Sequence, residues 1–187
     1  MNNENRIKKA SLNALTNYLR FFFTMVISFW LIPFIINNLG QTIYGLWTLS
    51  FSIIGFFSLL DFGFGLGVVK WTGEARVTQD YEHRNRMLST VFFIYLVIAG
   101  VAILLLSVFS LFYANLFSIP KGLQSTAVAV LLILGVRTLV IQLPLSLFKG
   151  ALFGEQRIYL VNCIQIIGTL VYAASAYLVL SNQKGIL

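Results

Sequence analysis

The chain has 187 residues, of which 58% are hydrophobic and only 10% are charged, and its formal net charge is +7. Soluble domains carry about 25% charged residues, so this chain cannot enclose an apolar core within a polar surface and must face lipid. Its basic residues lie mostly between apolar runs, which argues against nucleic acid as a partner. The single cysteine, Cys163, excludes an internal disulfide, and no metal or cofactor site is indicated.

Five apolar stretches are long enough to cross the hydrocarbon core as helices, which takes about 20 residues. They are too long for the strands of a membrane barrel and do not alternate strictly. The sequence therefore predicts an all-α, polytopic transmembrane helical bundle of about five spans in a single transmembrane domain. In chain order the spans cover residues 12–36, 43–69, 87–112, 127–147 and 158–180.

The basic residues outside the spans are unequally divided between the two sides of the membrane. Nine fall in the N-terminal tail and in the loops after the second and fourth spans, namely Arg6, Lys8, Lys9, Lys70, Arg76, Arg84, Arg86, Lys149 and Arg157. The opposite side holds two, Lys121 and Lys184. By the positive-inside rule the N-terminus is cytoplasmic. An odd number of spans then leaves the C-terminus outside. Because the chain stops just past a span, we expect a truncated protein.

Polar side chains follow one face of the first span. The spacing i, i+3, i+4, i+7, i+11 places Asn13, Thr16, Asn17, Arg20 and Thr24 on the same side of a helix. The fifth span repeats this pattern more weakly with Asn162, Gln165, Thr169 and Tyr172, and the fourth offers Arg137, Thr138 and Gln142. One interpretation is that these spans wall a hydrophilic cavity. The other is that the polar groups only form hydrogen bonds between helices.

Three charged residues lie inside the spans, where charge is costly. Arg20 and Asp61 each lie about 12 Å from the cytoplasmic ends of antiparallel spans, so they are candidates for an ion pair at equal depth. The alternative is that Asp61 caps or bends its own helix. Arg137 lies near the midplane without an obvious acidic partner, which favours a role in holding an anionic ligand. Snorkelling or bonding to backbone carbonyls is the alternative for Arg137.

Small residues crowd the inner end of the second span. Gly63 and Gly67 form a G-x-x-x-G pattern, which predicts close helix contact, although the same glycines also suit a flexible point. Pro33 lies near the end of the first span, where it kinks a helix. No loop carries a nucleophile with a base, so the sequence predicts no catalytic residues and no enzymatic activity.

Two segments carry a family resemblance. Residues 38–47 read NLGQTIYGLW and residues 56–65 read FFSLLDFGFG. Together with the basic loop that precedes residue 87, they resemble the N-terminal part of the polysaccharide-biosynthesis, O-antigen and teichoic-acid exporter family. These are lipid-linked oligosaccharide flippases of the multidrug/oligosaccharidyl-lipid/polysaccharide exporter superfamily. The resemblance covers residues 10–180, and structural roles are expected for Pro33, Gly40, Tyr44, Gly45, Asp61, Gly63, Gly65 and Gly67.

The resemblance implies a bacterial inner-membrane transporter that flips undecaprenyl-pyrophosphate-linked oligosaccharide for O-antigen and lipopolysaccharide, capsule or teichoic acid. Arg20 and Arg137 would attract the pyrophosphate. The cavity would be completed by Asn13, Asn17, Thr24, Gln142, Asn162 and Gln165. Expected partners are the lipid-linked oligosaccharide, membrane lipids, and a C-terminal lobe or other glycan-assembly membrane proteins. The alternatives are a multidrug exporter of the same superfamily and a membrane polymerase or acyltransferase of the glycan pathway.

The chain departs from this family in length. About five spans correspond to most of one six-helix lobe, whereas alternating access needs two repeats that move against each other. We therefore expect an incomplete N-terminal lobe.

Overall fold

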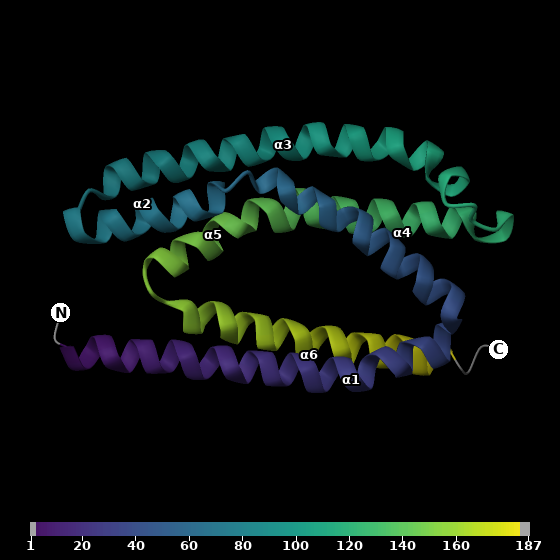
Figure 1. The fold of residues 1–187 in the computed structure, drawn as a ribbon, viewed down its shortest axis with the longest axis horizontal. Coiled ribbons are helices and arrows are strands. Elements are labelled where there is room, and N and C mark those ends of the chain that lie inside the picture. Colours follow the sequence, from purple (N-terminus) through teal and green to yellow (C-terminus); the bar gives the residue numbers. More distant parts are fainter. Residues whose placement is uncertain (1–2, 184–187) are drawn as a thin grey trace. The chain divides into compact units, whose positions relative to one another are not determined.

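The computed structural model describes residues 3–183, so Lys184 and the C-terminal end lie outside the described residues. The described residues contain helices and turns and no strand, which confirms the all-α prediction. Figure 1 shows the elements, which are α1 (Asn3–Phe56), η1 (Phe57–Asp61), α2 (Phe64–Thr78), α3 (Tyr81–Leu116), η2 (Lys121–Leu123), α4 (Gln124–Val136), η3 (Arg137–Gln142), α5 (Leu143–Gly154) and α6 (Ile158–Gln183).

Helices long and apolar enough to cross a membrane confirm a multi-pass protein. Among the described residues there are four, Ile7–Asp61, Tyr81–Leu116, Lys121–Gly154 and Ile158–Asn182. The first contains most of two expected spans, because α1 continues past the expected turn and only kinks at Gly40, with φ 80° and ψ 160°. Glycine suits this position because its missing Cβ permits a positive φ. Pro33 lies inside α1 without taking the backbone out of the helical region.

The chain divides into two compact units. Unit 1 combines α1 up to Tyr44 with α6, and unit 2 comprises Gly45–Glu155. The prediction of a single transmembrane domain concerns the membrane-embedded whole and stays a prediction. In unit 1 the two helices lie side by side (Figure 1). Near one end Trp30 stacks on Phe34 at 5.3 Å between ring centroids, and Tyr177 of α6 lies 5.4 Å from Phe34.

Unit 2 has a core in two parts. The last turns of α1 pack with α3 and α4 around Leu106 and Leu131, which are fully buried. Ser50 and Tyr113 share a buried hydrogen bond of 2.9 Å there. The second part joins α2, α3 and α5 around Val68, Tyr95 and Leu147. Burial of such side chains contributes about 1.5–3 kcal/mol each in water, but in lipid the contacts act mainly through packing and hydrogen bonding.

The expected span 43–69 is not one continuous helix. After α1 the backbone tightens into the 3₁₀ turn η1, and then Phe62 and Gly63 adopt left-handed conformations with φ 47° and 80°. A new helix, α2, starts at Phe64. The fourth expected span is also irregular, because the π-helix η3 separates α4 from α5.

Close helix packing occurs at other glycines than those expected. A Cβ placed on Gly154 of α5 would lie 2.6 Å from the Thr72 Cβ and 2.7 Å from the Val69 carbonyl oxygen of α2. Gly150, one turn earlier, would approach the Gly65 carbonyl oxygen at 3.2 Å. The G-x-x-x-G contact thus belongs to Gly150 and Gly154. At Gly63 a Cβ would meet nothing within 4 Å, and at Gly67 its three nearest atoms belong to Trp71 of the same helix, so helix contact through Gly63 and Gly67 stays a prediction.

Candidate functional site

Part of the polar face of α1 serves helix pairing within unit 1. The Asn13 amide donates to the Gln156 carbonyl oxygen at 3.1 Å, and its Oδ1 accepts from the Tyr159 backbone N–H at 2.9 Å. One turn further, Asn162 Nδ2 of α6 donates to the Thr16 hydroxyl at 3.1 Å in a buried position. These contacts favour the interhelical hydrogen-bond interpretation for Asn13 and Asn162, and their place in a cavity wall stays a prediction.

The rest of that face forms few side-chain contacts within the described residues. Arg20 donates from Nη2 to Asn17 Oδ1 at 3.0 Å, and its Nε is buried without a hydrogen-bond partner among the described residues. Asn17 and Thr24 are exposed, and Gln165 of α6 is half-buried. A guanidinium has five N–H donors, so most N–H groups of Arg20 form no hydrogen bond within the described residues.

Arg137 starts the π-helix η3 in unit 2. Its side chain is exposed, and Thr138 and Gln142 belong to the same short segment. Such π-turns cost helix stability and occur frequently at functional sites. No feature of the sequence predicts this irregularity, because the apolar pattern of the span runs through it unchanged.

Asp61 is held by two groups of unit 2. The Tyr95 hydroxyl of α3 donates to Asp61 Oδ1, and the Gly65 backbone N–H points to Oδ2 at 3.4 Å. The second contact favours the interpretation that Asp61 caps the helix that follows it. Because Arg20 belongs to unit 1 and Asp61 to unit 2, their pairing stays a prediction.

A cavity of about 320 Å³ lies beside Asp61. It is bounded by η1 and α2 on one side and by η3 and α5 on the other, so both helix irregularities of unit 2 border it. The lining residues are Phe57, Asp61, Gly65, Leu66, Val69, Thr138, Leu139, Gln142, Leu143, Ser146, Lys149, Gly150 and Phe153. Thr138 and Gln142, two of the polar residues expected on the fourth span, thus line this cavity.

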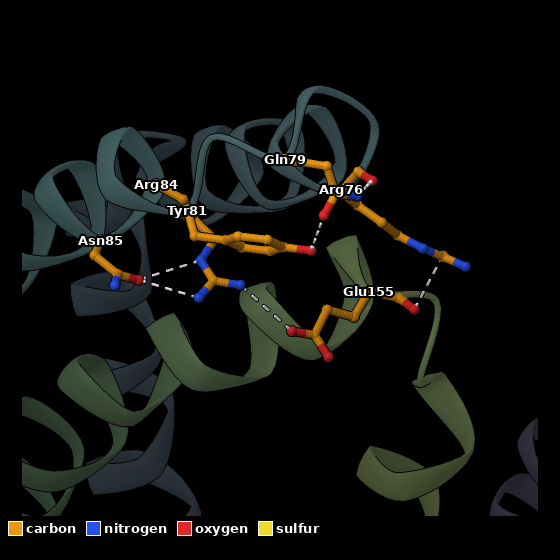
Figure 2. A network of polar contacts seen from close by, with 6 residues as sticks. All are labelled: Arg76, Gln79, Tyr81, Arg84, Asn85 and Glu155. Atoms are coloured by element: carbon orange, nitrogen blue, oxygen red, sulfur yellow. Dashed lines mark hydrogen bonds and ion pairs between the residues drawn. The ribbon is translucent and has the colours of Figure 1, made fainter.

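A polar network joins the α2–α3 turn to the end of α5 (Figure 2). Arg84 lies 3.7 Å from the Glu155 carboxylate and 5.1 Å from the centre of the Tyr81 ring. Arg76 donates to the Glu155 carbonyl oxygen at 3.3 Å. The loops that follow the second and fourth expected spans therefore lie at the same end of unit 2, as the charge distribution predicted. Which side of the membrane this end faces stays a prediction.

Sequence reasoning missed the groups around Asp61. Tyr95 lies in the apolar third expected span and Ser146, whose hydroxyl neighbours that of Tyr95, in the apolar fourth, so no polar pattern marks either residue. Lys149 was read only as a loop charge, although it lines the cavity. The available signal was the acidic residue itself, since a carboxylate inside a span requires polar neighbours.

The fold defines the chain as a multi-pass helical membrane protein, and a comparison with curated proteins agrees with that class. The chain is 24% identical over 170 residues to the uncharacterized membrane protein EpsK of Bacillus subtilis (strain 168). The match covers 91% of this chain, which spans 34% of the relative's length. No family model and no solved structure matches the chain.

Proposed function

We propose that this chain is part of a transporter that flips undecaprenyl-pyrophosphate-linked oligosaccharide across a bacterial inner membrane during surface polysaccharide biosynthesis. In this proposal it is not an enzyme, its N-terminus is cytoplasmic, and it works with further transmembrane helices that complete the transport path. The similarity to EpsK along 91% of the chain supports a membrane protein of a related kind.

The observation that carries the proposal is the state of Arg20. It lies within an apolar segment of α1, has one hydrogen bond to Asn17, and forms no ion pair among the described residues. A guanidinium in lipid surroundings needs hydrogen-bond acceptors, and a pyrophosphate offers oxygen atoms with the geometry of its donor fork. The exposed Asn17 and Thr24 add neutral polar groups beside it for the sugar hydroxyls.

Arg137 extends the proposal to unit 2. Its exposed guanidinium lies at the start of a π-helix, inside a segment long and apolar enough to span a membrane. Each arginine is proposed to attract the anionic head group of the substrate, while the isoprenoid tail stays in lipid. Two arginines and one acidic residue, Asp61, lie inside the expected spans, and this balance favours an anionic cargo over the cationic drugs that a multidrug exporter would carry.

The test replaces each arginine by alanine in the producing bacterium and measures surface polysaccharide together with the level of the protein in the membrane. Loss of a charged hydrogen bond costs about 1.5–3 kcal/mol, so we expect export to fall roughly ten- to hundredfold. Arg20→Lys should recover only part of the activity, because an ammonium lacks the planar donor fork.

Lys70→Ala is the matched control, since it also removes one positive charge but at an exposed position paired with Glu74. Export should stay near normal in this variant. Normal export in both arginine variants at normal protein levels would reject the proposal.

A further inference from the structure

We propose that the cavity beside Asp61 binds one acyl chain of an anionic phospholipid, with the phosphate of the lipid head group at Lys149. Every lining residue belongs to unit 2, so the argument depends on one compact unit alone. Binding of a bilayer lipid here goes beyond the proposed function and does not depend on which cargo the transporter carries.

The lining of the cavity suits hydrocarbon. Apolar groups make up almost all of its surface, with Phe57 from η1, Leu66 and Val69 from α2, and Leu143 and Phe153 from α5. A cavity with such a lining favours an apolar occupant, because a polar ligand would lose hydrogen bonds to water without replacing them.

Polar groups on the cavity are bound by unit 2 itself. Asp61 Oδ1 accepts a hydrogen bond from the Tyr95 hydroxyl, and Oδ2 faces the Gly65 backbone N–H at 3.4 Å. The Ser146 hydroxyl donates to the Leu143 carbonyl oxygen at 2.6 Å. Because these groups have partners in the protein, they need no polar ligand, and a hydrocarbon chain can lie beside them.

The depth of the cavity suits a chain that starts at the membrane surface. At 1.5 Å per residue, Lys149 lies about 7.5 Å and Leu143 about 16 Å from Gly154, the last residue of α5. Half of a hydrocarbon core that is about 30 Å thick measures about 15 Å. The lining therefore extends over the depth of one leaflet, which is also the depth that an acyl chain occupies.

The charge at the cavity selects the head group. Lys149 is exposed, its ammonium lies 5.7 Å from the centre of the Phe153 ring, and it forms no salt bridge among the described residues. Its long stem lets the ammonium reach the level of the lipid phosphates. Basic pockets between transmembrane helices bind anionic head groups in this way.

The same charge distinguishes a phospholipid from the cargo of the proposed transporter. A phosphodiester carries one negative charge, which the single ammonium of Lys149 balances. A pyrophosphate carries more charge and suits the planar donor fork of an arginine better than a lysine. Lys149 therefore favours a bilayer lipid as the occupant of this cavity.

The experiment compares phosphatidylglycerol with phosphatidylcholine that has the same acyl chains, by mass spectrometry of their complexes with the purified chain in detergent. We expect phosphatidylglycerol to bind about fivefold more tightly, which is the contribution of one basic residue near a membrane surface. Lys149→Gln should abolish this preference. Val69→Trp, which fills the cavity and keeps the charge, should weaken binding of both lipids severalfold, with thermal unfolding as the check that the variant is folded.

Lys70→Gln is the matched control, because it removes the same charge from an exposed side chain of α2 that pairs with Glu74 and does not line the cavity. It should keep the full preference for phosphatidylglycerol. Glycerol phosphate, which resembles the head group without the acyl chains, should not displace phosphatidylglycerol.

Three results would overturn the proposal. The first is equal binding of the two lipids or no binding of either, and the second is a preference that survives Lys149→Gln. The third is tighter binding of undecaprenyl phosphate than of phosphatidylglycerol, lost in Val69→Trp, because the cavity would then hold the tail of the cargo. Each of these results leaves the export tests of Arg20 and Arg137 unaffected, so the two proposals can fail separately.

Discussion

The two units of this protein place polar groups inside apolar helices in opposite ways. In unit 1 long regular helices use polar residues as pairs: Asn13 bonds the start of α6, and Thr16 meets Asn162. In unit 2 the helices are interrupted, and the polar residues gather around a cavity with Asp61 at its edge. The difference shows that the regular helices of unit 1 use some of their polar residues for contacts between helices, whereas the interrupted helices of unit 2 gather theirs beside a cavity.

The largest effect on this difference between the units is expected from disturbing the contact between α2 and α5 in unit 2. Gly154→Val adds atoms where Thr72 and the Val69 carbonyl oxygen leave no room, so we expect a loss of about 3 kcal/mol in stability. Thermal unfolding in detergent measures the effect. Gly168→Val in α6 is the control, because a Cβ there meets nothing within 4 Å; equal losses in the two variants would contradict the packing argument.

Removing the hydroxyl that holds Asp61 should have the next largest effect. Tyr95→Phe keeps the buried ring but deletes the hydrogen bond to the carboxylate, with an expected cost of about 2 kcal/mol. Unfolding temperature is again the readout, compared with Tyr172→Phe, in which the tyrosine that loses its hydroxyl is exposed. Equal stability of both variants would mean that the Tyr95–Asp61 contact contributes nothing.

The hydrogen bond between Thr16 and Asn162 in unit 1 should contribute less to stability than the contacts in unit 2, and its effect should depend on both residues. Asn162→Ala removes the bond to Thr16, and we expect a loss of about 1 kcal/mol, within the range of polar contacts between membrane helices. A double-mutant cycle with Thr16→Ala isolates the shared part. Asn182→Ala, at an exposed position of the same helix, is the reference. A coupling energy of zero would show that the two residues act independently.

The smallest effect is expected at the end of unit 2. Glu155→Gln weakens the contact with Arg84 but keeps the carbonyl oxygen that accepts from Arg76. Partly exposed ion pairs contribute about 0.5 kcal/mol and are screened by salt. The difference in unfolding temperature from the unmodified chain should therefore shrink at high salt. Glu82→Gln, a more exposed partner of Arg86, should change less.

The sequence predicted the helical class because composition and span length depend on local residue type alone. It also predicted the polar face of α1, since the spacing of Asn13, Thr16 and Arg20 follows helical geometry. It did not predict that η1 and η3 interrupt their helices, because each interruption depends on contacts with other helices. Asp61 was recognised as unusual from its charge, but Tyr95 and Ser146 come from distant parts of the chain and share no motif with it. Gly150 and Gly154 have the G-x-x-x-G spacing, yet so do Gly63 and Gly67, and only packing distinguishes them.

The interrupted helices also bear on how the protein enters the membrane during synthesis. At 1.5 Å per residue, the 15 residues of α2 extend about 22 Å, and the 12 residues of α5 about 18 Å, whereas the hydrocarbon core measures about 30 Å. Neither is long enough to cross the hydrocarbon core alone, so each can complete a crossing only together with the stretch that precedes it. We therefore expect a substitution near Gly63 or in η3 to affect how completely the joined stretch crosses the membrane, as well as its folded contacts.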